Sequence, residues 1–313
     1  MDAELKAPFP YFGGKSKVAP RVWEIFGAVK NYVEPFAGTL AVLLRRPAGS
    51  FGVETVNDYS CFVVNAWRAI SHNPLMIAEM CVEPCSEVDT EARHYHLLTK
   101  EMQLRDLLGD PLFYDPMLAV WWIKGACEWI GGGWASGEGP WQWTREGGWA
   151  KKDTGTGVNR QLPHLGNGGK GERERRVEWL QDWFSALSDR LCQVRITCGD
   201  WSRVAKSTSA TTKLGVTAIF LDPPYKGTGY VYSGKNCSVS DDVNAWCASV
   251  SDPRLRIILC GRGDEHDNLL ALGWKKEGWA TRQGYSRDGG VGATSEALWH
   301  NVIDDNDFSR LLS

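Results

Sequence analysis

The segment Asp222-Pro223-Pro224-Tyr225 places an acid, two rigid residues and an aromatic ring directly after the apolar run Ala218–Leu221. Prolines fix φ and donate no backbone hydrogen bond, so the run is predicted to be a strand that ends here with a stiff edge. Asp222 and the Pro223 carbonyl could accept hydrogen bonds from an amino group on an aromatic ring and make its nitrogen more nucleophilic. Tyr225 offers a face for stacking a base swung out of its duplex. The alternative is an ordinary proline turn with Tyr225 packed in the core.

A second group of candidate residues follows the predicted strand around residues 32–33. In Glu34-Pro35-Phe36-Ala37-Gly38-Thr39, the glycine lets a ligand approach the backbone closely. Asp58 ends the next predicted strand, where a carboxylate can bind ribose hydroxyls. That spacing also fits a dinucleotide-binding fold, and Asp58 could instead be a turn residue. The phosphate-loop pattern GxxxxGK[ST] is absent.

The elements that must position these residues alternate between short apolar strands and helices. Helices are predicted over 18–29, 40–44, 61–71, 172–191, 240–250 and 266–274, and 72–120 is predicted to be mostly helical. Strands are predicted over 51–60, 192–200, 216–225, 255–261 and 295–302. This order predicts an α/β fold with a mostly parallel sheet, and ligands bind beyond the carboxyl ends of such strands. Asp58, Asp200 and Asp222 each lie at such an end, although Asp200 could also cap the helix predicted to follow it.

The chain has sixteen tryptophans, and seven of them fall in one short region: Trp121, Trp122, Trp129, Trp134, Trp141, Trp143 and Trp149. Residues 131–171, rich in Gly and Trp, are predicted to form irregular surface loops with a hairpin. The tryptophans could build a small core, or they could stack on bases. Basic residues follow them and could hold phosphates, or could simply form a solvated face.

Composition narrows the class of protein. The 313 residues are 43% hydrophobic and 23% charged, as in soluble globular proteins, and the net charge of −3 gives no sign of a nucleic-acid partner. The nine cysteines form no zinc-ligand pattern, so no metal is predicted; free thiols in a reducing cytosol are expected. No secretory signal is recognised, and no apolar run reaches the length of a membrane helix.

Several motifs, in order, resemble one family. "PYFGGK" resembles an N-terminal cofactor motif close to KWAGGK, and "VEPFAGTLAVLL" resembles the FxGxG cofactor loop. "VNDYS" and "ITCGDWSRV" resemble acidic strand ends, "FLDPPY" the catalytic motif, and "EALWHN" a late strand. Together they resemble the Dam-type (alpha-group) S-adenosylmethionine-dependent DNA adenine N6-methyltransferases of phages or bacteria. Two positions depart from the pattern, because Leu40 replaces the second glycine of FxGxG and Tyr11 replaces a tryptophan.

The resemblance implies a Rossmann-like class I methyltransferase sheet with an inserted target-recognition domain. The catalytic, cofactor-binding domain would comprise 1–71 and 177–313, and the inserted DNA-binding region 72–176. The catalytic residues would be Asp222, Pro223, Pro224 and Tyr225. The cofactor-binding residues would be Tyr11, Gly13, Gly14, Lys15, Glu34, Phe36, Gly38, Asp58, Asp200, Trp201 and Asp222. Lys15 could instead be a solvated loop lysine.

The implied substrate is a flipped adenine in double-stranded DNA, methylated by direct transfer with no essential cysteine. Cytosine N4 methylation, RNA or protein amide methylation and a catalytically silent DNA-binding homologue are the alternatives; an oxidoreductase is remote because no GxGxxG follows a strand. A bacterial or phage-infected cytoplasm is expected, without a membrane partner, and the chain could be a monomer or a weak dimer. The sequence leaves the target site and the biological role open, whether restriction-modification, phage counter-defence or housekeeping. Candidate DNA contacts are Lys124, Trp134, Trp141, Trp143, Lys151, Lys152, Arg160 and Arg173.

Overall fold

The computed structural model describes residues 5–11, 14–49, 52–83, 87–129, 134–135, 141–144, 148–151, 173–225, 239–280 and 295–302. The chain divides into two compact units, each assembled from separate stretches. Unit 1 comprises Met1–Lys17, Gly38–Arg45 and Ser60–Gly199, and unit 2 comprises Val18–Ala37, Arg46–Tyr59 and Asp200–Ser313. These boundaries differ from the two domains predicted from sequence. The helices α2 (Cys61–His72) and α6 (Arg173–Leu191), assigned there to the catalytic domain, pack with α3 (Pro74–Cys81) and α5 (Pro116–Glu128) in unit 1. The functional division into catalytic and target-recognition domains stays a prediction.

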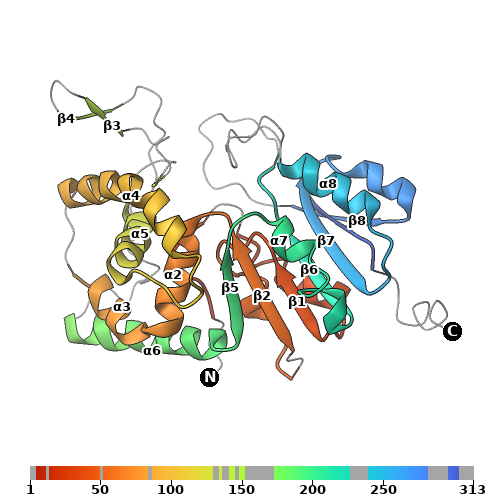
Figure 1. The fold of residues 1–313 in the computed structure, drawn as a ribbon, viewed down its shortest axis with the longest axis horizontal. Helices are drawn as coiled ribbons and strands as arrows, with labels where there is room; N and C mark the ends of the chain where they lie inside the picture. The colour runs from red at the N-terminus through yellow and green to blue at the C-terminus, as the bar shows by residue number, and fades with distance from the viewer. Residues whose placement is uncertain are drawn as a thin grey trace. The chain divides into compact units, whose positions relative to one another are not determined.

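The sheet has seven strands in the order β5-β2-β1-β6-β7-β9-β8 (Figure 1). Its strands are β1 (Asn31–Glu34), β2 (Val53–Asp58), β5 (Val194–Cys198), β6 (Thr217–Leu221), β7 (Leu255–Arg262), β8 (Lys275–Ala280) and β9 (Ser295–His300). Strands β2, β1, β6 and β7 pair in parallel, and β9 runs antiparallel to both β7 and β8. The mostly parallel α/β sheet predicted from the sequence is therefore confirmed.

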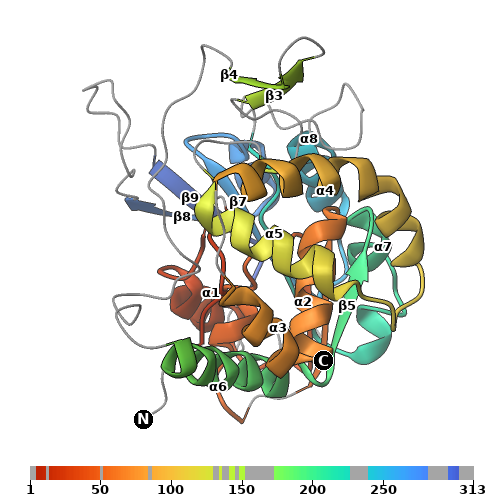
Figure 2. The ribbon, with the colours of Figure 1, turned by 90° about the vertical axis from the view of Figure 1, so that its left-hand side faces the viewer.

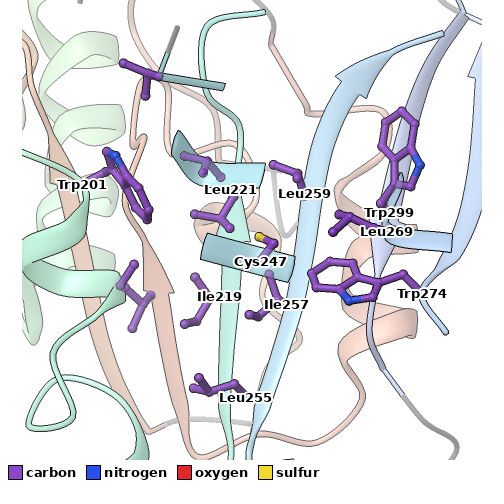
Figure 3. Packing of buried hydrophobic residues seen from close by; sticks show 14 of the residues in the cluster. Trp201, Ile219, Leu221, Cys247, Leu255, Ile257, Leu259, Leu269, Trp274 and Trp299 are labelled. Carbon is purple, nitrogen blue, oxygen red and sulfur yellow. The ribbon is translucent and has the colours of Figure 1, made fainter. Parts of the chain in front are cut away.

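The core of unit 2 lies against β6 and β7, whose residues are almost all buried. Strands covered on both faces read as continuous apolar runs, as Ala218–Leu221 does. Figure 3 shows Ile219, Leu221 and Ile257 in this cluster. The helical elements of unit 2 are α1 (Ala19–Phe26), α7 (Ser202–Ala205), α8 (Val239–Ser249), and the 3-10 turns η3 (Thr212–Leu214) and η4 (Asp267–Leu272).

Unit 1 is mainly helical (Figure 2). Its elements are the 3-10 turn η1 (Leu43–Arg45), α2 (Cys61–His72), α3 (Pro74–Cys81), α4 (Glu87–Leu107), α5 (Pro116–Glu128), the hairpin β3 (Trp141–Thr144)–β4 (Gly148–Lys151), α6 (Arg173–Leu191) and strand β5. Ser60 and Asp115 cap α2 and α5 by accepting the backbone N–H of the third helical residue. The buried Arg68 of α2 donates to carbonyls of Ile196 in β5 and of Leu108, Asp110 and Phe113 in the α4–α5 loop, so one side chain satisfies backbone acceptors of two segments.

Three local predictions from the sequence were wrong. The helix predicted over 40–44 is only the short η1, because Gly38 and Leu40 have positive φ and cannot continue a right-handed helix. The helix predicted over 266–274 is the 3-10 segment η4, which ends at Gly273 with φ 85°. Strand β8, "KKEGWA", was not predicted, because its polar sequence lacks an apolar alternation and its pairing with β9 holds it in the sheet.

Candidate active site

The Asp222–Tyr225 segment leaves β6 at the carboxyl edge of the sheet, as predicted, and β6 ends at Leu221 directly before it. Asp222 is half-buried, and Tyr225 is buried with its hydroxyl donating to Asp222 Oδ1 at 3.2 Å. Burial, reinforced by the negative charge of Asp222, raises the pKa of Tyr225, so the hydroxyl stays protonated as a donor. The arrangement holds a carboxylate beside an aromatic ring at a strand end.

Glu34 and Asp58 end the neighbouring strands β1 and β2 at the same edge, because β2, β1 and β6 are parallel. Both carboxylates are buried, and Glu34 Oε2 accepts the Tyr32 hydroxyl at 2.9 Å. Buried acids at the carboxyl ends of parallel strands suit the binding of ligand hydroxyls. Unit 2 therefore brings Glu34, Asp58 and Asp222 to one edge of its sheet.

The loop after β1 is fastened to β2 by Asn57, a residue that the sequence analysis did not single out. The backbone N–H of Ala37 donates to the Asn57 carbonyl at 2.9 Å, and Asn57 Nδ2 donates to the Pro35 carbonyl at 3.1 Å. Ala37 and Asn57 are both buried, and the two hydrogen bonds fix the loop that carries Phe36 to strand β2. An asparagine between an apolar strand and an acid was the only signal that could have pointed to it.

An aromatic pair lies beside this loop in unit 2. The rings of Phe36 and Trp201 stack with centroids 6.3 Å apart and an interplanar angle of 26°. Asp200 Oδ1 accepts both the backbone N–H of Ser202 at 2.9 Å and its hydroxyl at 2.5 Å. The N-cap residue of α7 is Trp201, so the helix-cap role considered as the alternative for Asp200 is not observed. Asp200 thus orients the turn that presents Trp201.

In unit 1, the N-terminal motif and the glycine loop meet. A Cβ atom added to Gly38 would lie 3.1 Å from Cδ1 of Tyr11, and the Gly38 carbonyl accepts Trp67 Nε1 at 2.8 Å. A side chain at position 38 would therefore crowd the Tyr11 ring and would be strained at the φ of 44°. Gly14 and the buried Lys15 follow Tyr11 in the chain, and Gly13 lies outside the described residues.

Leu40 takes the backbone conformation that the replaced glycine would adopt. Its φ is 55°, and its side chain is fully buried, with 0% exposed. A left-handed conformation costs an L-residue roughly 1–2 kcal/mol, whereas burying a leucine contributes about 1.5–3 kcal/mol. Core packing therefore offsets the strain, and the FxGxG-like loop keeps its shape without the second glycine.

The predicted DNA contacts are described only in part. Lys124 is buried and its ammonium group donates to the Glu83 carbonyl, which favours a structural role over a phosphate contact. Trp134 donates its Nε1 proton to the Trp122 carbonyl at 3.0 Å and covers Gly125, so it packs inside unit 1. The side chains of Trp141, Trp143, Lys151 and Arg173 and the whole of Lys152 and Arg160 lie outside the described residues.

Several thiols of the described residues are buried and protonated. Burial raises the pKa of Cys61 and of Cys81 to about 12, and it raises that of Cys247 further. Such thiols carry almost no thiolate at neutral pH and are poor nucleophiles. This agrees with a direct transfer that forms no cysteine adduct.

Among the described residues, no helix combines the length and the apolar character needed to cross a membrane. Residues 11–104, from the N-terminal motif into α4, match the D12 class N6 adenine-specific DNA methyltransferase family. The matched range contains the glycine loop and Asp58 and ends before β6. No curated protein matches the chain.

Proposed function

We propose a catalytic arrangement for this chain, which the family match identifies as a Dam-type DNA adenine methyltransferase. In it, Asp222 and the Pro223 carbonyl accept the two N–H bonds of the adenine amino group. The observation that carries this proposal is the half-buried Asp222 carboxylate at the carboxyl end of β6, held by the Tyr225 hydroxyl at 3.2 Å.

The chemistry follows from the electronic state of the substrate nitrogen. Its lone pair is delocalised into the purine ring, and two acceptors on its N–H bonds draw the nitrogen toward tetrahedral geometry. S-adenosylmethionine supplies an electrophilic methyl group when bound. The Asp222 carboxylate, or water, would accept the excess proton that methyl transfer leaves on the adenine nitrogen.

The residues present fit this cofactor. In unit 2, the carboxylates of Glu34 and Asp58 suit ribose hydroxyls, and Phe36 and Trp201 form a stacked pair that suits an adenine ring. In unit 1, the missing Cβ of Gly38 lets the Tyr11 ring lie close to the glycine loop, and both residues belong to the proposed cofactor-binding set. Gly13, Gly14, Lys15, Asp200 and Asp222 complete the proposed cofactor-binding set.

We also propose that the adenine is flipped out of double-stranded DNA, because its amino group is not accessible to Asp222 inside a stacked duplex. Tyr225 would then support the flipped base. The proposed DNA contacts are Trp141, Trp143, Lys151, Lys152, Arg160 and Arg173; Lys124 and Trp134 are weaker candidates, because their polar groups donate to carbonyls of unit 1.

The test is methyl transfer from tritiated S-adenosylmethionine to unmethylated DNA, followed by modified-base sequencing to identify the base and its context. We expect label on adenine N6, and we expect Asp222→Ala to lower the rate by at least about 10²-fold, as losing a group that stabilises the transition state does. Asp252→Ala is the control, because it removes the same charge from the amino end of β7. Label on cytosine, or transfer that persists in Asp222→Ala, would contradict the proposal.

A further inference from the structure

The ring of Tyr225 is covered by a side chain that the proposed mechanism does not use. Arg262, the last residue of β7, places its guanidinium carbon 4.9 Å from the centroid of the Tyr225 ring. Arg262 is exposed, whereas only 8% of Tyr225 is exposed. A base could therefore stack on that face of the ring only after the guanidinium has moved.

The sheet explains why these two residues meet. Strands β6 and β7 are parallel neighbours with Leu221 opposite Leu259, so both chains leave the sheet at the same edge. The backbone N–H of Arg262 donates to Glu265 Oε2 at 3.1 Å. The Arg262 backbone also lies opposite that of Glu296 in the antiparallel pairing of β7 and β9. The backbone of Arg262 is thus fixed.

The guanidinium itself is held less firmly. Among the residues that the structure describes, no carboxylate forms an ion pair with it, so its stacking on Tyr225 is its one recorded side-chain contact. The contact between Tyr225 and Asp222 also links this ring to the proposed acceptor of the amino group. Movement of the Arg262 guanidinium off the Tyr225 ring would therefore expose the ring without breaking an ion pair.

We propose that Arg262 is a positioning residue that covers the Tyr225 ring before DNA binds and yields it to the target adenine. The guanidinium then binds a backbone phosphate near the flipped base. Arginine suits both states, because its planar cation stacks on aromatic rings and also pairs with phosphate oxygens. A purine gains more from stacking on the same ring than an exposed cation does, so the exchange favours the base. The inference rests on the proposed role of Asp222 and Tyr225.

The first experiment measures DNA binding against salt concentration. It uses a fluorescent duplex that contains the site found by modified-base sequencing, with S-adenosylhomocysteine present. We expect Arg262→Ala to weaken binding about tenfold and to lower the slope of log Kd against log salt by about 0.9, the loss of one phosphate contact. Arg262→Lys, which keeps the charge, should restore the slope.

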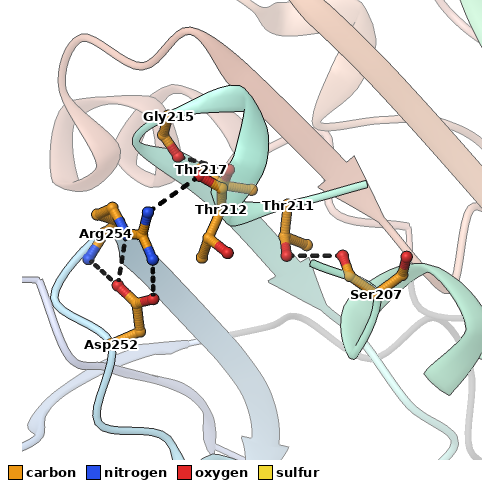
Figure 4. Close-up of polar contacts among 7 residues, drawn as sticks. All are labelled: Ser207, Thr211, Thr212, Gly215, Thr217, Asp252 and Arg254. Atoms are coloured by element: carbon orange, nitrogen blue, oxygen red, sulfur yellow. Dashed lines mark hydrogen bonds and ion pairs between the residues drawn. The ribbon is translucent and has the colours of Figure 1, made fainter. Parts of the chain in front are cut away.

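Arg254→Ala is the matched control from the same strand. Arg254 lies just before β7 at the opposite end of the strand, where its guanidinium pairs with Asp252 at 2.6 Å and donates to the Thr212 carbonyl at 3.3 Å (Figure 4). We expect its removal to leave the salt slope as in the unchanged protein. An equal slope in Arg262→Ala and the unchanged protein would overturn the proposal, provided that thermal melting shows both to be folded.

The second experiment distinguishes two roles of Arg262. Its guanidinium could leave the Tyr225 ring when the base is flipped, or it could stay and hold the flipped base. The target adenine is replaced by 2-aminopurine, whose emission rises when it leaves the stack, and is measured at saturating protein. We expect emission in Arg262→Ala at or above that of the unchanged protein, since nothing must be displaced from Tyr225. Lower emission would show that Arg262 holds the flipped base and would overturn the proposal. Methyl transfer by the unchanged protein is needed to identify the duplex, but neither readout measures methyl transfer by the variants. Failure of Asp222 as the catalytic acceptor would therefore be seen separately in the tritium assay.

Discussion

The aromatic cluster around His94 in unit 1 and the pair formed by Phe36 and Trp201 in unit 2 use similar rings in different settings. His94 stacks on Trp129 with centroids 4.5 Å apart, and its Nδ1 accepts the backbone N–H of Ala135 at 3.1 Å. Phe36, in contrast, is only partly buried and lies on the loop after β1, beside the acidic strand ends. In the first cluster, His94 Nδ1 and Trp134 Nε1 form hydrogen bonds within unit 1, whereas the second presents a ring at the sheet edge.

This difference shows that a high local number of tryptophans does not by itself identify a ligand-binding surface. The dense tryptophan region drew attention as a surface for stacking on bases, yet Trp122, Trp129 and Trp134 pack within unit 1. The ring best placed for a ligand, Phe36, comes from a loop with no unusual composition. We infer that the first cluster serves stability and the second serves binding, and the following changes test that division.

The largest effect is expected from Trp129→Ala. Because Trp129 is buried against His94 and Trp134, the cavity should lower the free energy of unfolding by about 3–5 kcal/mol. Denaturant unfolding would measure it, with Trp179→Ala on the exposed side of α6 as the control. If cofactor affinity of the folded variant also fell sharply, the cluster would not be purely structural.

The next largest effect is expected in the pH dependence of the free energy of unfolding, which His94 should dominate between its folded and unfolded pKa values. Burial lowers the pKa of His94 from 6.5 to about 4, so the folded state binds fewer protons than the unfolded state between these values. The stability from neutral His94 is complete above pH 6.5 and is lost as the pH falls to about 4, by at most about 3 kcal/mol. In denaturant unfolding of His94→Gln, the free energy of unfolding should change less with pH over this range. The same pH dependence as in the original protein would contradict the lowered pKa of His94. His72→Gln, at the exposed end of α2, is the control.

A smaller effect is expected from Phe36→Ala. Loss of the stack on Trp201 should weaken S-adenosylmethionine binding about tenfold, or about 1.4 kcal/mol, with a modest change in melting temperature because Phe36 is only partly buried. Calorimetry would measure the affinity. Phe36→Tyr keeps a ring in place and should restore most of it, whereas equal affinities in all three proteins would remove Phe36 from the cofactor site.

The smallest effect is expected from Cys198→Ala at the end of β5. Direct transfer to nitrogen needs no thiolate, so the single-turnover rate should stay within about twofold of the original, a change below about 0.5 kcal/mol. Cys260→Ala tests a buried thiol in β7 in the same way. Loss of the chemical step in either folded variant would require a covalent intermediate.

Features that depend on neighbouring residues could be predicted from the sequence, and those that depend on distant residues could not. The stiff end of β6 follows from Pro223 and Pro224 alone, and the acid at its end follows from the apolar run that stops at Asp222. The contact of Arg262 with Tyr225 depends on which strands become neighbours, as does β8, whose sequence carries no strand signal of its own. The family match, which ends at residue 104, supports the function without reaching Asp222.

The left-handed leucine at position 40 has a consequence for how binding responds to damage in unit 1. A glycine would adopt this backbone shape without strain, whereas Leu40 is strained in it and depends on the packing of its side chain. The conformation of the loop beside Gly38 therefore depends on the packing of the core around Leu40. We expect a distant substitution that loosens that core to change the shape of the loop before the chain as a whole unfolds.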